Sequence, residues 1–494
     1  MSPNKLYNSR FNAMMTDAYQ LTMSEAAFKL KKHETETVFD VFFRSIPWQG
    51  GFAVFAGSAE LLGFLKHFTF SEEEINYLKK ESGIPFSDKF LDYLRTFKFS
   101  GSIYSVPEGN IIFPNEPFMR IHGNITEIRI LESSLLTIVN SASLWTTKAA
   151  RLRLAVGHGH LMEFGMRRAQ STMAGYNASR YGYIGGFDST SNVRAGMDFG
   201  IPVAGTQAHN WVQQFDSEYE AFLSYAEAFP KSVILLVDTY DTIKSGLPNA
   251  VKVFQKLRDM DSLPEQYGIR LDSGDLAFLS KEARKILDKT GFNEALIAAS
   301  NDLDEYLIET IINQGGKISH WGVGTNFVTC QGNSAFGAVL KLAALIEDGI
   351  EKPKIKISNQ PEKITLPGIK QIYRVVTKDG KFAADVIACD IEKFDQNQDY
   401  KLVDPEHRWR QQVYRKGEYK LVPLLKQIVK NGELLIQVDI KATRKNVREQ
   451  INCMWPEYLR FVNPELYKVN LSQKLSKLKT ELIEKEIKTF INSP

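Results

Sequence analysis

The sequence predicts an α/β fold built around a parallel sheet or barrel. Two segments, 232–238 (SVILLVD) and 295–300 (ALIAAS), are nearly continuous apolar runs, as expected for strands buried on both faces. After the second run, apolar residues recur with a helical period over 303–311, and Gly315-Gly316 ends that helix. The segment 317–323 then has the composition of another strand. This succession is one βαβ unit, and several such units in series indicate a parallel architecture.

The composition is that of an ordinary folded enzyme. The chain has 494 residues, 43% hydrophobic and 24% charged, and its formal net charge of +3 gives no sign of a nucleic-acid partner. Cys330, Cys389 and Cys453 are far apart and odd in number, which favours a reducing compartment over a disulfide framework. The N-terminus lacks the apolar core of a signal peptide, and no run of about 18 apolar residues occurs. We therefore expect a cytoplasmic protein without a membrane span.

The N-terminal region mixes helix and strand signals. Thr16 is placed to cap a helix over 17–29. The β-branched and aromatic segment 37–43 (TVFDVFF) predicts a strand. A serine followed by acidic residues opens a predicted helix over 71–78.

The next region changes from strand to helix signals. Residues 101–130 are strand-like, and the alternation at 127–130 predicts a half-exposed sheet. A long helix follows, because apolar residues recur every three or four positions over 135–152, and Gly157 can end it. Further along, Asp302 and Glu305 have the spacing of a capping box for the helix after 300.

The chain divides into three expected segments. Residues 1–150 form a mixed α/β domain, and residues 151–346 form the α/β barrel. Residues 347–494 begin with a linker rich in Lys, Pro and Gly and continue with short extended strands. They end in an amphipathic helix from Ser472, and we expect this extension to pack on the first domain.

Polar, acidic or glycine-containing clusters follow five consecutive candidate strands, the first of them at 202–206. In α/β barrels the active groups lie at the C-terminal ends of the strands, so the repetition of these clusters indicates a site. The clusters are Gln207-Ala208-His209-Asn210, Asp238-Thr239-Tyr240-Asp241-Thr242, Asp272-Ser273-Gly274-Asp275, Ser300-Asn301-Asp302 and Gly324-Thr325-Asn326.

Two of these clusters fit a phosphorylated sugar. Gly322, Gly324 and Thr325 can present backbone N–H groups and a hydroxyl to a phosphate; the alternative is a glycine turn without such a role. Asp272 and Asp275 can hold Mg²⁺ together with diphosphate or ribose oxygens; the alternative is an Asx-turn.

A histidine and an arginine complete the candidates. His209 can accept a phosphoryl group or act as a base, with Asp238 as the candidate that orients its ring; the alternative is a structural histidine. Arg167 suits a carboxylate, although a surface salt bridge is the alternative. His158 and His160 lack a third ligand, so a zinc site is rejected. The sequence has no Walker A run, so any ATP would bind by another arrangement.

Ten ordered motifs make the chain resemble the nicotinate phosphoribosyltransferase family. They cover about residues 10–375, and together they are far more specific than any one of them. The motifs are TDAYQLTM (16–23), VFFRSIPWQGGFAVFAG (41–57), EFGMRRAQ (163–170), GGFDSTSNV (185–193), AGTQAHNWV (204–212), VDTYDT (237–242), GIRLDSGDL (268–276), ASNDLDE (299–305), WGVGTNF (321–327) and KISNQPEKITLPGIKQIYR (356–374).

The resemblance implies a reaction and a fold. Nicotinate attacks C1 of phosphoribosyl pyrophosphate, giving nicotinate mononucleotide and pyrophosphate, and ATP hydrolysis is coupled through a phosphohistidine. This is the first step of NAD salvage from nicotinic acid, with Mg²⁺ and without a tightly bound organic cofactor. The implied fold is an irregular α/β barrel of the type II phosphoribosyltransferase kind with a mixed α/β N-terminal domain. A homodimer with shared active sites is expected.

The resemblance also assigns roles to single residues. His209 matches the phosphorylated histidine, and Asp238 matches its carboxylate partner. Tyr19 is expected to stack on the pyridine ring from the neighbouring subunit, Phe164 to cover the other face, and Arg167 to lie near the pyridine substituent. The residues expected around the ribose and phosphates are Arg270, Asp272, Asp275, Gly322, Gly324, Thr325 and, across the dimer, Arg44.

Ser191 bears on the choice of pyridine. It lies where related nicotinamide-using enzymes carry an aspartate, which would accept from an amide but repel a carboxylate, whereas a serine can donate to one. A nicotinamide phosphoribosyltransferase and a non-catalytic sugar-phosphate-binding protein are the alternatives. Asn210 and Ser189 replace the more usual serine and glycine of the family; both are small and polar, so we expect a retained site.

Overall fold

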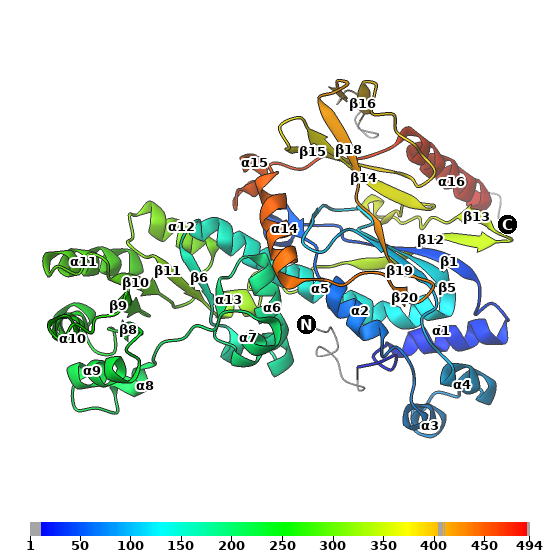
Figure 1. The fold of residues 1–494 in the computed structure, drawn as a ribbon. Helices are drawn as coiled ribbons and strands as arrows, with labels where there is room; N and C mark the ends of the chain where they lie inside the picture. The colour runs from blue at the N-terminus through cyan, green and yellow to red at the C-terminus, as the bar shows by residue number, and fades with distance from the viewer. Residues whose placement is uncertain (1–10, 404–408, 410, 492–494) are drawn as a thin grey trace. The chain divides into compact units, whose positions relative to one another are not determined.

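The chain folds into two compact units. The computed structural model describes residues 11–403, 409 and 411–491 (Figure 1). One unit combines the two ends of the chain, Met1–Leu144 and Ala335–Pro494, and the other is the intervening Trp145–Ser334. The C-terminal extension expected from residue 347 thus belongs to the same unit as the N-terminal region. We call these the terminal unit and the central unit.

The main sheet of the terminal unit brings together strands from both ends of the chain. Within the described residues it has seven strands in the order β13-β12-β1-β5-β3-β19-β20. The predicted strand at 37–43 is confirmed as β1, which pairs antiparallel with both β12 and β5. The strands are β13 (Ile350–Pro353), β12 (Val339–Glu347), β1 (Glu36–Phe42), β5 (Met119–Asn124), β3 (Ser102–Ser105), β19 (Lys426–Lys430) and β20 (Glu433–Leu434).

A second sheet of the terminal unit is formed by the later part of the chain. Its described strands have the order β18-β14-β15-β21, and two small pairs, β16-β17 and β2-β4, complete the strands of the unit. These strands are β18 (Tyr419–Pro423), β14 (Lys370–Thr377), β15 (Phe382–Cys389), β21 (Val469–Leu471), β16 (Tyr400–Val403), β17 (Gln411–Tyr414), β2 (Ala53–Val54) and β4 (Ile111–Ile112).

The helices of the terminal unit confirm most sequence predictions. Ser71 forms a capping box with Glu74 at the start of α3. The predicted cap of the first helix is wrong: within the described residues Asp17 occupies the N-cap position without a side-chain cap bond, and the Thr16 hydroxyl is buried without a partner. The α-helices are α1 (Ala18–Lys29), α2 (Ser58–Leu65), α3 (Glu72–Lys80), α4 (Asp88–Arg95), α14 (Ile440–Asn452), α15 (Pro456–Leu459) and α16 (Gln473–Ile491), and the 3₁₀ turns are Pro47–Gln49 and Pro361–Lys363.

The long predicted helix exists but starts earlier than expected. Helix α5 spans Ile125–Val156, and Gly157 ends it with a φ of +62°. The half-exposed sheet expected at 127–130 is therefore wrong. Asn124 accepts a hydrogen bond from the backbone N–H of Glu127 at 2.9 Å and nucleates the first turn, and Ile128 and Leu131 are buried at helical spacing.

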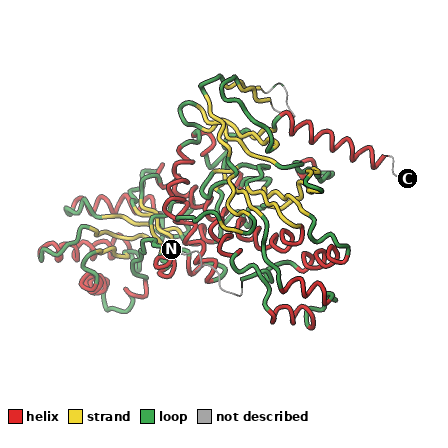
Figure 2. Tube along the Cα trace, turned by 45° about the vertical axis from the view of Figure 1, so that its right-hand side comes forward, coloured by secondary structure: helices red, strands yellow, loops and turns green. Residues whose placement is uncertain are grey.

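The central unit is built on a parallel sheet. Its described strands have the order β7-β6-β11-β10-β9-β8, and every neighbouring pair is parallel. The predicted α/β barrel is present as this parallel half-barrel, with helices on its outside (Figure 2). The strands are β6 (His160–Glu163), β7 (Ser189–Thr190), β8 (Ser232–Leu236), β9 (Gln266–Leu271), β10 (Leu296–Ala299) and β11 (His320–Val323).

Apolar side chains from strands and helices form one core in the central unit, with Trp321, Phe222 and Phe254 among its buried members. The helices are α6 (Thr172–Gly185), α7 (Val193–Phe199), α8 (His209–Val212), α9 (Glu218–Ala228), α10 (Leu247–Asp259), α11 (Leu276–Lys289), α12 (Glu305–Asn313) and α13 (Thr325–Val328), with a 3₁₀ turn at Met166–Arg168 and a π turn at Thr242–Gly246. In the described part of the chain, none of the helices is both long and apolar enough to cross a membrane.

Two predictions in the central unit are wrong. Residues 202–206 form only one bridge, between Thr190 and Val203, rather than a strand, so the first of the five clusters follows a loop. Asp304, not Asp302, caps α12, because its side chain accepts from the backbone N–H of Leu307 at 2.7 Å. Glu305 is fully buried and pairs with Lys148 and Arg151 instead of closing a capping box.

Candidate functional site

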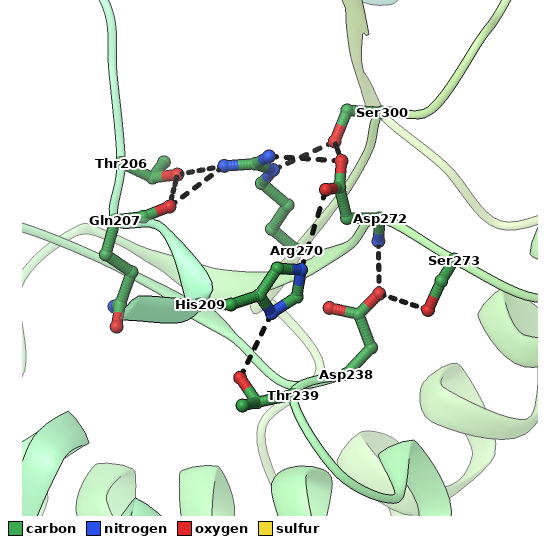
Figure 3. Close-up of polar contacts among 9 residues, drawn as sticks. All are labelled: Thr206, Gln207, His209, Asp238, Thr239, Arg270, Asp272, Ser273 and Ser300. Atoms are coloured by element: carbon green, nitrogen blue, oxygen red, sulfur yellow. Dashed lines mark hydrogen bonds and ion pairs between the residues drawn. The ribbon is translucent and has the colours of Figure 1, made fainter. Parts of the chain in front are cut away.

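Arg270 lies at the centre of a polar cluster at the C-terminal ends of the parallel strands (Figure 3). Its Nη1 donates to the Thr206 hydroxyl at 2.8 Å and to the Gln207 carbonyl at 3.1 Å. Its Nε donates to the Ser300 hydroxyl at 2.9 Å, and its Nη2 donates to Asp272 Oδ1 at 3.1 Å. The Arg270 guanidinium therefore connects three segments that are distant in sequence, at residues 206–207, 272 and 300.

Asp272 connects this arginine to the histidine. Its Oδ1 accepts from Arg270 and from the Ser300 hydroxyl, and its Oδ2 lies 3.7 Å from His209 Nε2. Burial raises the pKa of Asp272, but the charge of Arg270, the bond from Ser300 and the nearby His209 outweigh it, so the pKa lies below its usual value. Asp272 is thus an ionised carboxylate in a half-buried position.

His209 begins the short helix α8 and points into the cluster (Figure 3). Its Nδ1 lies 3.2 Å from the Thr239 hydroxyl. Asp238, the predicted partner of this ring, has no hydrogen bond to it among the described residues: its Oδ2 accepts from the backbone N–H of Asp272 at 2.8 Å and from the Ser273 hydroxyl at 2.6 Å. Asp238 therefore braces the loop after β9, and Thr239 holds the ring.

Asp275 has a structural role as a helix cap, separate from the predicted role in ligand binding. Its Oδ1 accepts from the backbone N–H of Phe278 at 2.9 Å and caps helix α11, which corresponds to the local-turn alternative. In the described ranges there is no group of three or more His, Cys, Asp or Glu side chains placed to hold a metal ion. A divalent cation at this site would need oxygens from the substrate as well as from the protein.

Glu163 organises a second part of the strand-end face and was not singled out from the sequence. It ends β6 and is 1% exposed. Its carboxylate accepts from the backbone N–H of Gly165 and from the hydroxyls of Ser179, at 2.9 Å, and Thr190. Burial raises the pKa of Glu163, although these three bonds oppose the shift. Its own carbonyl accepts from the backbone N–H of Ser191 at 2.9 Å.

The predicted pyridine contacts of the central unit lie around Glu163. Phe164 and Ser191 are half-buried at the ends of β6 and β7. The guanidinium carbon of Arg270 lies 5.9 Å from the centre of the Phe164 ring. Arg167 lies on the turn after Phe164 and is exposed, and within the described residues its side chain has no ion-pair partner.

Packing requires the two glycines at the end of β11, one inside the strand and one directly after it. A Cβ on Gly322 would lie 2.7 Å from the Phe164 ring, and a Cβ on Gly324 would lie 2.9 Å from the Phe164 carbonyl oxygen. Thr325 opens α13 directly after them. Their closeness to Phe164 explains these glycines, and the phosphate cradle remains a prediction. Asn301 has a φ of +98°, a strained conformation that often marks a functional loop.

Tyr19 and Arg44 belong to the terminal unit. Tyr19 is 52% exposed on α1 and borders a pocket of about 630 Å³ with Met15, Glu132 and Asn140. Burial and the charges of Glu132 and Asp17 raise the pKa of its phenol. Arg44 donates from Nε to the Glu362 carbonyl at 3.3 Å.

Four polar residues of the site were missed as candidates. Thr239 and Ser300 lie within the sequence clusters and Thr206 directly before one, but hydroxyls are common near strand ends and carry no distinguishing signal. In the sequence, Glu163 is distinguished only as the first residue of the motif EFGMRRAQ. Its role depends on Ser179 and Thr190, which are distant in sequence. An acidic residue ending an apolar strand was the one available clue.

The parallel half-barrel is the architecture of a type II phosphoribosyltransferase. The crystal structure of human nicotinic acid phosphoribosyltransferase superposes with a TM-score of 0.82 at 29% identity, covering 94% of this chain and 99% of that one. Nicotinate-nucleotide pyrophosphorylase from Pyrococcus furiosus has the same fold, with a TM-score of 0.66 at 23% identity, covering 89% of this chain and 95% of that one.

The sequence comparisons define the family. The chain matches the nicotinate phosphoribosyltransferase N-terminal domain over residues 14–140, the nicotinate phosphoribosyltransferase family over 159–397 and the C-terminal domain over 369–479. Nicotinate phosphoribosyltransferase of Bacillus subtilis is 41% identical over 93% of both chains, and the human enzyme is 31% identical over 95% of this chain and 96% of its own length. The chain belongs to the nicotinate phosphoribosyltransferase family of enzymes.

Proposed function

We propose that this protein is an ATP-coupled nicotinate phosphoribosyltransferase. The pyridine nitrogen of nicotinate attacks C1 of phosphoribosyl pyrophosphate, the C1–O bond breaks, and nicotinate mononucleotide and pyrophosphate leave. The observation that carries the proposal is the Arg270–Asp272–His209 cluster at the C-terminal strand ends. A guanidinium and an ionised carboxylate at this edge suit a sugar diphosphate, and a histidine beside them suits phosphoryl transfer.

The contacts of His209 support Nε2 as the nucleophile toward ATP. Thr239 engages Nδ1, whereas Nε2 has no hydrogen bond within the described residues and lies 3.7 Å from Asp272 Oδ2. In the proposed step the terminal phosphoryl group of ATP passes to Nε2 and ADP leaves. Water later takes the phosphoryl group as inorganic phosphate. The Asp272 carboxylate favours the positive charge that the ring carries during the transfer.

The phosphorylated sugar fits the same edge of the sheet. We assign the ribose and diphosphate to Arg270, Asp272 and the second carboxylate oxygen of Asp275, whose first oxygen caps α11. Mg²⁺ would arrive on the diphosphate as part of the substrate, with Asp272 as the nearest carboxylate, because few protein ligands suffice for this ion. Backbone N–H groups after β11, at Gly324 and Thr325, suit the 5′-phosphate.

Nicotinate is assigned to the edge formed by Phe164, Arg167 and Ser191. Phe164 offers a ring face, Arg167 an exposed guanidinium without an ion pair among the described residues, and Ser191 a hydroxyl that can donate to a carboxylate. Tyr19 and Arg44 would complete the site of a second copy in a homodimer. The exposed ring of Tyr19 beside an open pocket agrees with such a role.

A pyridine panel with and without ATP tests the assignment. Nicotinate, nicotinamide and quinolinate are each incubated with phosphoribosyl pyrophosphate, and the mononucleotide products are quantified. We expect product from nicotinate and stimulation by ATP. Equal or better use of nicotinamide would reject the assignment in favour of a nicotinamide enzyme, and binding of the sugar diphosphate without product would favour a non-catalytic protein.

His209→Ala tests the phosphohistidine directly. With ATP labelled on its terminal phosphate, the wild-type protein should carry label that is stable to base and labile to acid. The variant should carry none, and its product formation should no longer respond to ATP. His158→Ala is the control, since His158 precedes the opposite, N-terminal end of β6. Label that persists in His209→Ala would contradict the role of this residue.

A further inference from the structure

Glu163 lies next to both residues to which the pyridine ring is assigned. Its carboxylate holds the backbone N–H of Gly165, the residue after Phe164. It also holds the hydroxyl of Thr190, the residue before Ser191, whose own N–H donates to the Glu163 carbonyl. Phe164 and Ser191 are thus each one residue away from a donor that Glu163 fixes.

The bonds of Thr190 have a fixed direction. Its hydroxyl oxygen accepts from the backbone N–H of Asn192 at 3.0 Å, so its proton is directed to Glu163. Asn192 in turn caps α7, accepting from Ala195 N at 3.1 Å. A series of directed hydrogen bonds therefore runs from the start of α7 through the loop that carries Ser191 to Glu163.

Burying a charged carboxylate costs free energy, so a carboxylate at this position is expected to have a role that depends on its charge. Within the described residues Glu163 has no cationic partner, and its three donors are neutral; one of them, the Ser179 hydroxyl, shares its single proton with the Gly175 carbonyl at 2.8 Å. An acceptor-only group receives all three donors in one arrangement, whereas a glutamine would turn an NH₂ group toward one or two of them. A buried charge compensated by hydrogen bonds alone is high in free energy and sensitive to the loss of any one bond.

We propose that Glu163 is a positioning residue that fixes Phe164 relative to Ser191 and thereby sets the affinity of the enzyme for the pyridine carboxylic acid. This inference rests on the proposed function. Among the described residues Glu163 forms no hydrogen bond to Arg270, Asp272 or His209, so its loss should act on the pyridine and not on the sugar diphosphate.

Glu163→Gln is the main test. The KM for nicotinate and its dissociation constant from calorimetry should rise about tenfold or more, as expected for lost hydrogen bonds to a charged group, while the KM for phosphoribosyl pyrophosphate stays within about twofold. Glu218→Gln is the matched control. Glu218 is also a buried glutamate of the central unit that accepts from a serine hydroxyl, that of Ser245, and its substitution should leave both KM values within about twofold.

Thr190 provides a second test that leaves the glutamate in place. Thr190→Val preserves the shape and removes the hydroxyl, and should raise the KM for nicotinate in the same selective way. Thr190→Ser keeps the hydroxyl and should restore the wild-type value. This pair remains informative even where Glu163→Gln does not fold, because a general loss of packing would not distinguish serine from valine.

The outcomes separate this inference from the proposed function. A selective rise in the nicotinate KM in Glu163→Gln or Thr190→Val, reversed in Thr190→Ser, supports the positioning role. Parallel changes in both KM values, or none, overturn it while the wild-type activity with nicotinate stands. A wild-type protein that neither binds nicotinate nor converts it would overturn the proposed function, and the positioning role with it.

Discussion

Two arginine–aspartate pairs, one in each unit, differ in their solvent exposure and in how many of their polar atoms already have a hydrogen-bond partner. In the terminal unit Arg374 and Asp385 are 2% and 0% exposed, and Arg374 also donates to Gln450 and to the Ile111 carbonyl. In the central unit Arg270 and Asp272 are 14% and 24% exposed.

The difference separates a structural pair from a functional one. Arg374 and Asp385 share three hydrogen bonds of 2.6 to 3.2 Å and are closed to solvent, so they can only hold the fold together. Asp272 keeps one oxygen beside a histidine and part of its surface open, so it can respond to a ligand. Residue type does not distinguish the two pairs; burial and bonding do.

Breaking the buried pair should have the largest effect, a loss of folding stability. Asp385→Ala leaves the Arg374 guanidinium buried without its counter-charge, which should cost about 3–5 kcal/mol of unfolding free energy. Urea unfolding followed by circular dichroism measures the loss. Asp272→Ala is the comparison and should cost less, because Arg270 is less deeply buried and keeps three other acceptors, Thr206, Gln207 and Ser300. Equal costs would remove the distinction between the two pairs.

The next effect is on the rate. Asp272→Asn keeps the size of the side chain but removes the charge beside Arg270 and His209, and should lower kcat/KM by about 10²–10³-fold, as for the loss of a preorganised electrostatic contact. Initial rates of nicotinate mononucleotide formation give the value. Asp288→Asn, which weakens a partly exposed pair with Arg284 away from the cluster, serves as the control. A rate near that of the wild type would mean that Asp272, like Asp385, has only a structural role.

Asp275 allows the fold role and the ligand role to be separated within one residue. Asp275→Ala removes the cap of α11 and should cost about 1 kcal/mol, whereas Asp275→Asn retains the cap and should cost a few tenths at most. If the second oxygen binds the sugar diphosphate, both variants should raise the KM for phosphoribosyl pyrophosphate. Melting temperature and KM are measured together. A KM change in the alanine variant alone would mean that the cap, not the charge, matters to the ligand.

The smallest expected effect is a pH dependence of stability that arises from Glu116, which lies beside the buried pair of Arg374 and Asp385. Burial and the adjacent Asp385 raise the pKa of Glu116 well above its usual value of 4.5, so the folded protein keeps a proton that the unfolded chain releases. Stability from this proton is complete below pH 4.5 and is lost as the pH rises through the higher folded-state pKa. Glu116→Gln removes the titration, so its stability relative to the wild type should increase with pH in unfolding measurements. A difference independent of pH would contradict the retained proton.

The sequence predicted the features that depend on neighbours in the chain. Strands β1, β8, β10 and β11 follow from continuous apolar or β-branched runs, and two of the predicted clusters, those of His209 and Asp272, lie together in the structure. Local signals failed where two of them compete. Asp302 and Asp304 are both plausible caps, and alternation at 127–130 fits a strand until the buried positions Ile128 and Leu131 are known.

The remainder depends on contacts between distant residues. Thr239, rather than the expected Asp238, holds His209 because the loop after β9 engages Asp238 through the Asp272 N–H and Ser273. Glu163 becomes recognisable only when Ser179 and Thr190 are brought to it. The buried pair of Arg374 and Asp385 gave no signal, because nothing in a charged residue on a strand indicates that both of its faces are covered.

The order in which the chain is made bears on how the two units form. The central unit is contiguous, Trp145–Ser334, so all of its strands are available once residue 334 has been synthesised. The main sheet of the terminal unit cannot be completed then, because β1 lies between β5 and β12, and β3 needs β19 from beyond residue 425. The three strands β1, β5 and β3 can pair with one another at that stage, but β1 and β3 keep open edges until the ribosome, adding about 5–20 residues per second, has made β12 and β19. A chaperone bound to nascent chains would find its substrate in these strands rather than in the half-barrel.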